Sequence, residues 1–137
     1  MKILVFDTET TGLPEEKASI YEVNKYPHIV QLSYIFYDAS NNNAIIKDNY
    51  IKLNPVIPIS EKSLEIHGLN HDYLNANGIH IIPALREFNE FLDRCDIVVG
   101  HNISFDKRMI FVECLRHKIE QKFTKYENNV KITKPEF

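Results

Sequence analysis

The fold of this chain is decided by the stretch from Ile3 to Leu13, which reads Ile-Leu-Val-Phe-Asp-Thr-Glu-Thr-Thr-Gly-Leu. Its first part, residues 3–6, is a short apolar run of β-branched and aromatic residues, which predicts a buried strand. Asp7 and Glu9 follow at a spacing of two, and alternate residues of a strand point to the same face. Two carboxylates on one face repel each other unless a cation lies between them. Hard oxygen ligands suit Mg²⁺ or Mn²⁺, so the stretch predicts a metal site where a strand ends.

Length and composition bound what the chain can be. With 137 residues, 44% of them hydrophobic, it is long enough for one domain with a core and too short for two comfortable ones. The net charge of −3 provides no global basic field for nucleic acid, although bound cations would change the local sign. Cys95 and Cys114 have no paired spacing, which favours a reduced, intracellular setting over a disulfide framework. The N-terminus lacks the apolar run of a signal peptide, and no stretch approaches the ~20 apolar residues of a membrane span, so we expect no membrane association.

Hydrophobic periodicity and turn residues predict the remaining elements. Three further strands are expected at residues 28–37, 44–53 and 96–100, with a weak edge strand at 130–133. Four helices are expected: two short ones capped by Ser60 and Asn70, one over residues 83–93, and one from Asn102 or Ser104 to about Lys118. Residues 14–27 read as a long loop. This order predicts an α/β domain with a mixed sheet, in which the first three strands are antiparallel and the fourth runs parallel to the first.

A second acidic position lies beside the first in this topology. Asp106 falls in the first turn of the helix that follows the fourth strand. The helix dipole favours a carboxylate there by roughly 0.3–1 kcal/mol, so a purely structural role is one interpretation. The topology favours another, because ligands in open α/β sheets bind at the carboxyl ends of strands. It brings Asp106 near Asp7 and Glu9, so that three acids converge. For residues 7–12 taken alone, an ordinary polar turn is the alternative interpretation.

Two segments carry a family resemblance. Residues 6–13 resemble the first motif of the DEDD 3′–5′ exonucleases, which are ribonuclease H-like enzymes that include the proofreading subunit of bacterial replicative polymerase. Residues 100–106 resemble the second motif, and residues 28–33 and 66–69 lie where the family has similar segments. The resemblance covers nearly the whole chain in the right order. It implies a ribonuclease H-like mixed sheet flanked by helices, residues 1–137 as a single exonuclease-like domain, and a place in DNA replication or repair.

The resemblance also implies what the converging acids do. Asp7, Glu9 and Asp106 match the catalytic carboxylates of the family, which hold two divalent ions, Mg²⁺ or Mn²⁺. The implied activity is metal-dependent 3′–5′ hydrolysis of phosphodiester bonds. The implied partner is the single-stranded 3′ end of a nucleic acid, and the sequence does not choose between DNA and RNA, because it shows no basic stripe or aromatic stacking run.

Four further positions match parts that hold the substrate in the family. The backbone near Thr8 and Thr10, with Leu13 as an apolar wedge, resembles the part that holds the terminal nucleotide. His67 lies in a loop that is near the substrate in the family. Its alternative interpretation is a loop histidine with a structural hydrogen bond. His101 resembles a family position that is not the catalytic base, and we expect it to be structural or a weak substrate contact.

The chain departs from the family at the third motif, which supplies a general base and a fourth carboxylate, an aspartate. Only 31 residues follow Asp106, and no aspartate is among them. We therefore expect a C-terminally truncated domain with impaired turnover, since a missing general base typically costs ~10²–10⁴-fold in rate. The alternative is a catalytically inactive exonuclease-like module that binds nucleic-acid ends or a partner protein. Truncation would leave the fourth strand, or a weak fifth one, as an exposed sheet edge open to a partner protein or to self-association.

Overall fold

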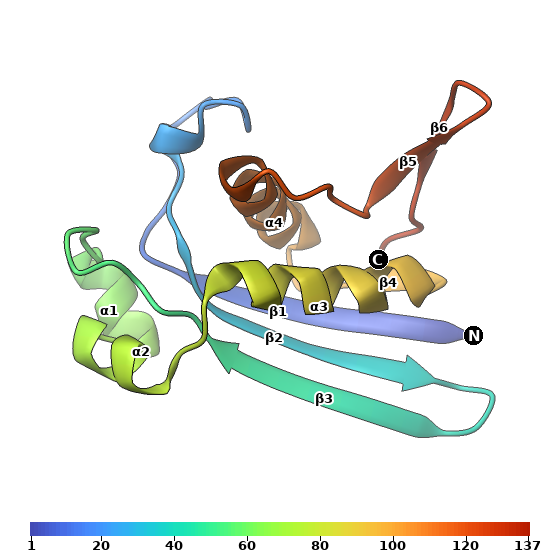
Figure 1. Cartoon of the computed structure of the whole chain (residues 1–137), viewed down its shortest axis with the longest axis horizontal. Coiled ribbons are helices and arrows are strands. Elements are labelled where there is room, and N and C mark those ends of the chain that lie inside the picture. The colour runs from blue at the N-terminus through green and yellow to red at the C-terminus, as the bar shows by residue number, and fades with distance from the viewer.

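A four-stranded sheet organises the computed structural model, which describes all 137 residues (Figure 1). Its strand order is β3-β2-β1-β4. The strands are β1 (Lys2–Thr10), β2 (Ile29–Asp38), β3 (Asn43–Tyr50) and β4 (Ile97–Val99). The pairs β1–β2 and β2–β3 are antiparallel, whereas β4 runs parallel to β1. The mixed sheet predicted from the sequence is therefore confirmed.

The two longer helices lie on one face of the sheet, and the two short ones lie beyond the end of β3 (Figure 1). The helices are α1 (Glu61–His67), α2 (His71–Asn77), α3 (Ile81–Arg94) and α4 (Ile103–His117). The loop between β1 and β2 contains one 3₁₀ turn, η1 (Val23–Lys25), and a separate hairpin of β5 (Thr124–Glu127) and β6 (Val130–Thr133) follows α4. None of the helices combines the length and apolar character that crossing a membrane requires.

The alternation of β1 sets the core on one side of the sheet. Leu4 and Phe6 point toward α3 and α4 and are almost fully buried. The Phe6 ring packs 5.2 Å from that of Phe88 on α3, and Tyr34 of β2 lies 5.3 Å from the same ring, with centroids as the reference points. Burying aromatic side chains in tilted contacts is among the largest favourable terms available to a chain of this size. The residues of β1 between these buried positions therefore face the other way.

The opposite face of the sheet is open. Val5, Ile35 and Ile46 are in register across β1, β2 and β3, and they are 39%, 40% and 71% exposed. Asp7 lies next along β1 on this same open face and is exposed. An apolar stripe beside an acid is therefore presented to solvent.

The polar half of β1 is a strand through Thr10, so the interpretation of residues 7–12 as an ordinary polar turn is wrong for residues 7–10. Thr11 and Gly12 form the bend that follows the strand. Asp7 pairs with Ser33, and Glu9 pairs with Gln31, as β2 continues alongside. Hydrogen bonding to a neighbouring strand outweighs the low strand preference of acidic residues. Two other boundaries differ by two or three residues from the prediction. Strand β3 ends at Tyr50 and not at residue 53, and α3 begins at Ile81 and not at residue 83.

The N-terminus of α4 differs in detail from the prediction. Asn102 precedes the helix as expected, but in the left-handed conformation, with φ 52° and ψ 54°. Its side chain makes no capping hydrogen bond. Asparagine tolerates this conformation better than most residues. It follows that Asn102 turns the chain from β4 into α4 through its backbone.

The sequence predicted an exposed edge at the fourth strand or at a weak fifth one, and for the fourth strand, β4, this is wrong. The C-terminal residues lie parallel to β4, where Val98 donates to the carbonyl of Pro135 at 2.9 Å and Phe137 donates to the carbonyl of Val98 at 2.9 Å. Gly100 donates to the carbonyl of Phe137 at 3.0 Å. The predicted strand at 130–133 does form, as β6, but it pairs only with β5. The edge of the main sheet without a partner strand is β3.

Candidate active site

Asp7 and Glu9 lie on the same face of β1, as their spacing predicted. Asp7 is exposed and Glu9 is partly buried. Burial raises the pKa of the Glu9 carboxyl, and the negative charge of Asp7 raises it further, whereas a positive charge on the nearby His67 would lower it. A raised pKa means that the second negative charge is unfavourable where it stands. The pair is therefore poised to accept a cation or a proton.

Asp106 approaches β1 from the covered face of the sheet. It lies in the first turn of α4 and is only 3% exposed. The hydroxyl of Thr8 donates to its Oδ1 at 2.5 Å, and the Thr8 backbone N–H donates to the same oxygen at 3.3 Å. Burial nevertheless raises the pKa of Asp106 to about 6, and the charges of Asp7 and Glu9 add to this shift. The three acids are thus coupled electrostatically, and their convergence on one metal site stays a prediction.

The donor chemistry of this site fits a hard divalent cation. All three candidate ligands are carboxylates, and two of them have raised pKa values because their negative charge is not balanced. Mg²⁺ commonly keeps several waters and uses only one or two protein carboxylates. As the side chains stand, no three His, Cys, Asp or Glu residues lie close enough together to hold an ion. A cation would therefore bind one or two of these acids, with water completing its coordination.

The end of β1 leads into a turn held by backbone contacts. The Thr10 hydroxyl donates to the carbonyl of Gly12 at 2.7 Å. His67 closes the turn from α1, with its Nε2 3.0 Å from the carbonyl of Thr10 and its Nδ1 accepting the N–H of Leu69 at 3.0 Å. Both ring nitrogens of His67 are thus used by the backbone, which supports the structural interpretation of this residue. Leu13 is 77% exposed, as an apolar wedge for a nucleotide would be.

His101 lies beside Asp7. The two residues line a shallow pocket of about 400 Å³ on the open face, together with Ser33, Tyr34 and parts of β1 and β2. His101 itself is exposed. A group bound to Asp7 from this side would therefore meet the imidazole of His101. The expectation that His101 is structural or a weak substrate contact stays a prediction.

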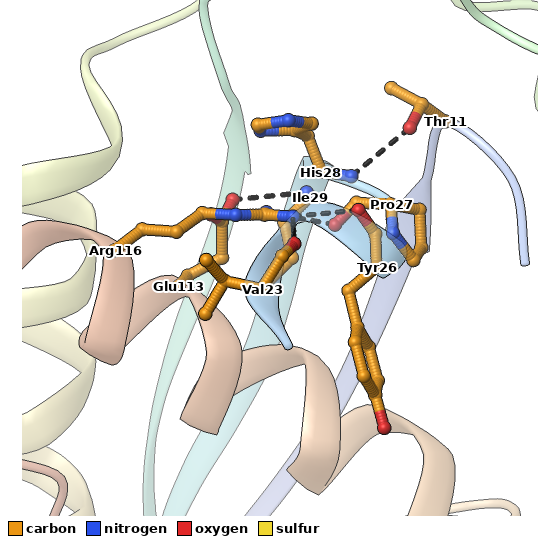
Figure 2. Close-up of polar contacts among 8 residues, drawn as sticks. All are labelled: Thr11, Val23, Tyr26, Pro27, His28, Ile29, Glu113 and Arg116. Carbon is orange, nitrogen blue, oxygen red and sulfur yellow. Dashed lines mark hydrogen bonds and ion pairs between the residues drawn. The ribbon is translucent and has the colours of Figure 1, made fainter. Parts of the chain in front are cut away.

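A network at the far end of α4 escaped sequence reasoning (Figure 2). The guanidinium of Arg116 donates to the carboxylate of Glu113 at 2.8 Å, and Glu113 also accepts the N–H of Ile29 at 3.1 Å. Three backbone carbonyls of the loop accept further bonds from Arg116: those of Val23 at 2.7 Å, Tyr26 at 2.6 Å and Pro27 at 2.9 Å. A Glu–Arg pair at this spacing is a common helix-surface feature, so the long-range contacts of Arg116 could not be predicted from it.

This network extends to the candidate site through His28. The N–H of His28 donates to the hydroxyl of Thr11 at 3.0 Å (Figure 2). The backbone N–H of Thr11 donates back to the His28 carbonyl at 2.9 Å. Burial lowers the pKa of His28, and the positive charge of Arg116 lowers it further. One helix therefore holds Asp106 at its first turn and, through its last turn, the segment that fixes the end of β1.

The strand order and the pairings of β1 match the ribonuclease H-like fold of the DEDD exonucleases. The chain belongs to the exonuclease family RNase_T, whose family model matches residues 4–137.

Individual relatives agree with this assignment. DNA polymerase III PolC-type from Pediococcus pentosaceus is 28% identical over 121 residues, which is 88% of this chain but 7% of that protein. Among solved structures, E. coli Exonuclease I in complex with a dA16 oligonucleotide shares the fold with a TM-score of 0.69 at 17% identity, over 87% of this chain and 24% of that one. Exonuclease I from Methylocaldum szegediense gives a TM-score of 0.62 at 18% identity, over 79% of this chain and 22% of that one. The chain thus spans a small part of each relative.

Proposed function

We propose that this chain is a metal-dependent 3′–5′ exonuclease domain, which hydrolyses phosphodiester bonds at single-stranded DNA or RNA ends inside the cell. The observation that carries the proposal is the match of the exonuclease family model to residues 4–137. The electrostatic coupling of the buried Asp106 to Asp7 and Glu9 supports it. The complex of the related Exonuclease I with dA16 supports single-stranded DNA as the first substrate to test.

In this proposal Asp7, Glu9 and Asp106 hold two Mg²⁺ or Mn²⁺ ions. Such ions, when bound, stabilise the attacking and leaving oxygens of the phosphate. Thr8 orients Asp106, because it binds Oδ1 and leaves Oδ2 free to face a cation. The turn after Thr10 receives the terminal nucleotide, and the exposed side chain of Leu13 packs against its base.

A second candidate function is binding of nucleic-acid ends, or of a partner protein, without cleavage. It is favoured by the arrangement of the acidic side chains, no three of which lie close enough together to hold an ion. The fold and the acids are the same in both candidates, so only turnover separates them.

The test is degradation of a 5′-labelled single strand, as DNA and as RNA, with Mg²⁺ or Mn²⁺. The wild type should give a ladder of products shortened from the 3′ end, and Asp7→Asn should lose about 10²-fold or more in rate. Glu90→Gln is the matched control, because it removes one exposed acid of α3 remote from β1. Equal rates for wild type and Asp7→Asn would assign the cleavage to a contaminant. Binding without cleavage by the wild type would favour the second candidate.

A further inference from the structure

A groove of about 500 Å³ lies along α4, outside the carboxylate site. Its floor is α4, one wall is the loop before β2, and the other wall is the hairpin of β5 and β6, which stands beside α4 and clear of the main sheet (Figure 1). The side chains that line it include Tyr21 of the loop, Lys107 of α4, and Thr124, Tyr126, Lys131 and Thr133 of the hairpin.

The register of the hairpin turns one face toward this groove. Thr124 pairs with Thr133, and Tyr126 pairs with Lys131, so these side chains share a face of the two-stranded sheet. All four line the groove, whereas Lys125 lies on the opposite face of the hairpin. The ring of Tyr126 and the ammonium of Lys131 are therefore presented side by side.

The lining is aromatic, hydroxylic and basic. No acidic residue lines the groove. Tyr21 and Tyr126 are 76% and 71% exposed. Lys107 is paired with Glu136 at 2.8 Å, and Lys125 is paired with Glu127 at 3.0 Å, so Lys131 is the lysine of the groove without an acidic partner.

The charge around the groove favours an anionic ligand. Residues 116–137 contain six basic and three acidic side chains, although the chain as a whole has a net charge of −3. The hairpin wall of the groove thus comes from a basic stretch of an acidic protein. Exposed aromatic rings next to an unpaired cation, with hydroxyls between them, match single-stranded nucleic acid, because every base has a face for stacking and every linkage carries a negative charge.

We propose that this groove is a second contact site for single-stranded nucleic acid, in which Tyr21 and Tyr126 stack on bases and Lys131 contacts phosphate. It rests on the proposed function in one respect: α4 carries Asp106 in its first turn and also forms the floor of the groove, so a strand bound at both places would contact the same helix. The hairpin then makes affinity depend on the length of the strand.

The test measures binding by fluorescence anisotropy in EDTA, where cleavage cannot occur, with labelled oligothymidylates of about 4 and about 16 nucleotides. Lys131→Glu and Tyr126→Ala should each weaken binding of the longer strand about 10-fold and leave the shorter one within about 2-fold. Lys125→Glu is the matched control, with the same charge change on the other face of the same hairpin. Tyr21→Ala is a second variant that leaves the hairpin intact, and it should act as Tyr126→Ala does.

The outcomes separate this proposal from the proposed function. If wild type binds both lengths equally, or if Lys131→Glu and Lys125→Glu weaken binding alike, the groove is not a nucleic-acid site, whatever the cleavage assay gives. If Tyr126→Ala abolishes self-association of the chain in solution and leaves nucleic-acid binding unchanged, the groove is a protein contact and the proposal is overturned. Length-dependent binding that Lys131→Glu removes supports the groove even if the wild type cleaves nothing.

Discussion

Thr8 and Asp106, which are 98 positions apart in the sequence, are joined by two hydrogen bonds to a single carboxylate oxygen. These bonds stabilise the charged form of Asp106, and so they lower its pKa. Burial and the neighbouring acids outweigh them, so that the pKa of Asp106 still rises to about 6. The folded protein therefore contains an acid whose ionisation near neutral pH costs stability.

Asp106→Asn is expected to stabilise the protein in metal-free buffer at pH 8. Asparagine keeps an oxygen that can accept both bonds from Thr8, and it removes the buried charge. Because the folded pKa lies above the unfolded value of about 3.9, the folded state binds the proton more tightly, and wild-type stability falls by about 2 kcal/mol as pH rises from 4 through 6. Urea unfolding at several pH values measures this. The variant should lack that loss, and an unchanged pH profile would contradict the assignment to Asp106.

Millimolar Mn²⁺ is expected to raise the thermal midpoint of the wild type by about 3–5 °C, because an ion that binds only the folded state stabilises it by mass action. Asp106→Asn should remove most of this response. Titration calorimetry without substrate should fit one site per chain, because the second ion of the proposed pair relies on water and substrate oxygens. Glu90→Gln serves as the control for a general effect of charge. A response that survives in the double variant Asp7→Asn, Asp106→Asn would place the metal elsewhere and remove the basis of the proposed mechanism.

Sequence patterns predicted the strand arrangement of the sheet and the shared face of Asp7 and Glu9, because both follow from local rules. The spacing of Asp7 and Glu9 fixes a shared face, and the crossover rule places β4 beside β1. The length of β1 was underestimated, because residues 7–10 are strand only by virtue of β2 alongside. The covered edge of β4 was missed for a similar reason, since pairing with residues 135–137 is a long-range backbone contact with no side-chain signature.

The details of the candidate site were less predictable than its location. The bond from Thr8 to Asp106 depends on how closely α4 packs on the covered face, which no spacing in the sequence encodes. Arg116 is the clearest case. Its three carbonyl acceptors come from the fold of the loop at residues 23–27, so only the local pair with Glu113 was visible in the sequence.

Arg116→Met is expected to destabilise the protein by about 3–5 kcal/mol, because it leaves the buried carboxylate of Glu113 without its partner. Arg116→Lys should recover only part of this, since lysine cannot form the planar fork that reaches several acceptors. Urea unfolding gives both values. Glu113→Gln provides the control: in the Arg116→Met background it removes the unpaired charge while keeping an acceptor for Ile29, so it should restore stability. Additive losses in the double variant would argue against this coupling.

His67 is expected to remain a neutral imidazole with its hydrogen on Nε2, whether or not an oligonucleotide is bound. The N–H of Leu69 donates to Nδ1, which must therefore lack a hydrogen, and Nε2 must then donate to the carbonyl of Thr10. Replacing His67 by alanine removes both bonds and should cost about 1–3 kcal/mol of stability. Nitrogen chemical shifts of the imidazole report the tautomer directly. If added oligonucleotide moves these shifts toward the other tautomer or the charged form, His67 contacts the substrate, and its structural role at Thr10 is the smaller part of its function.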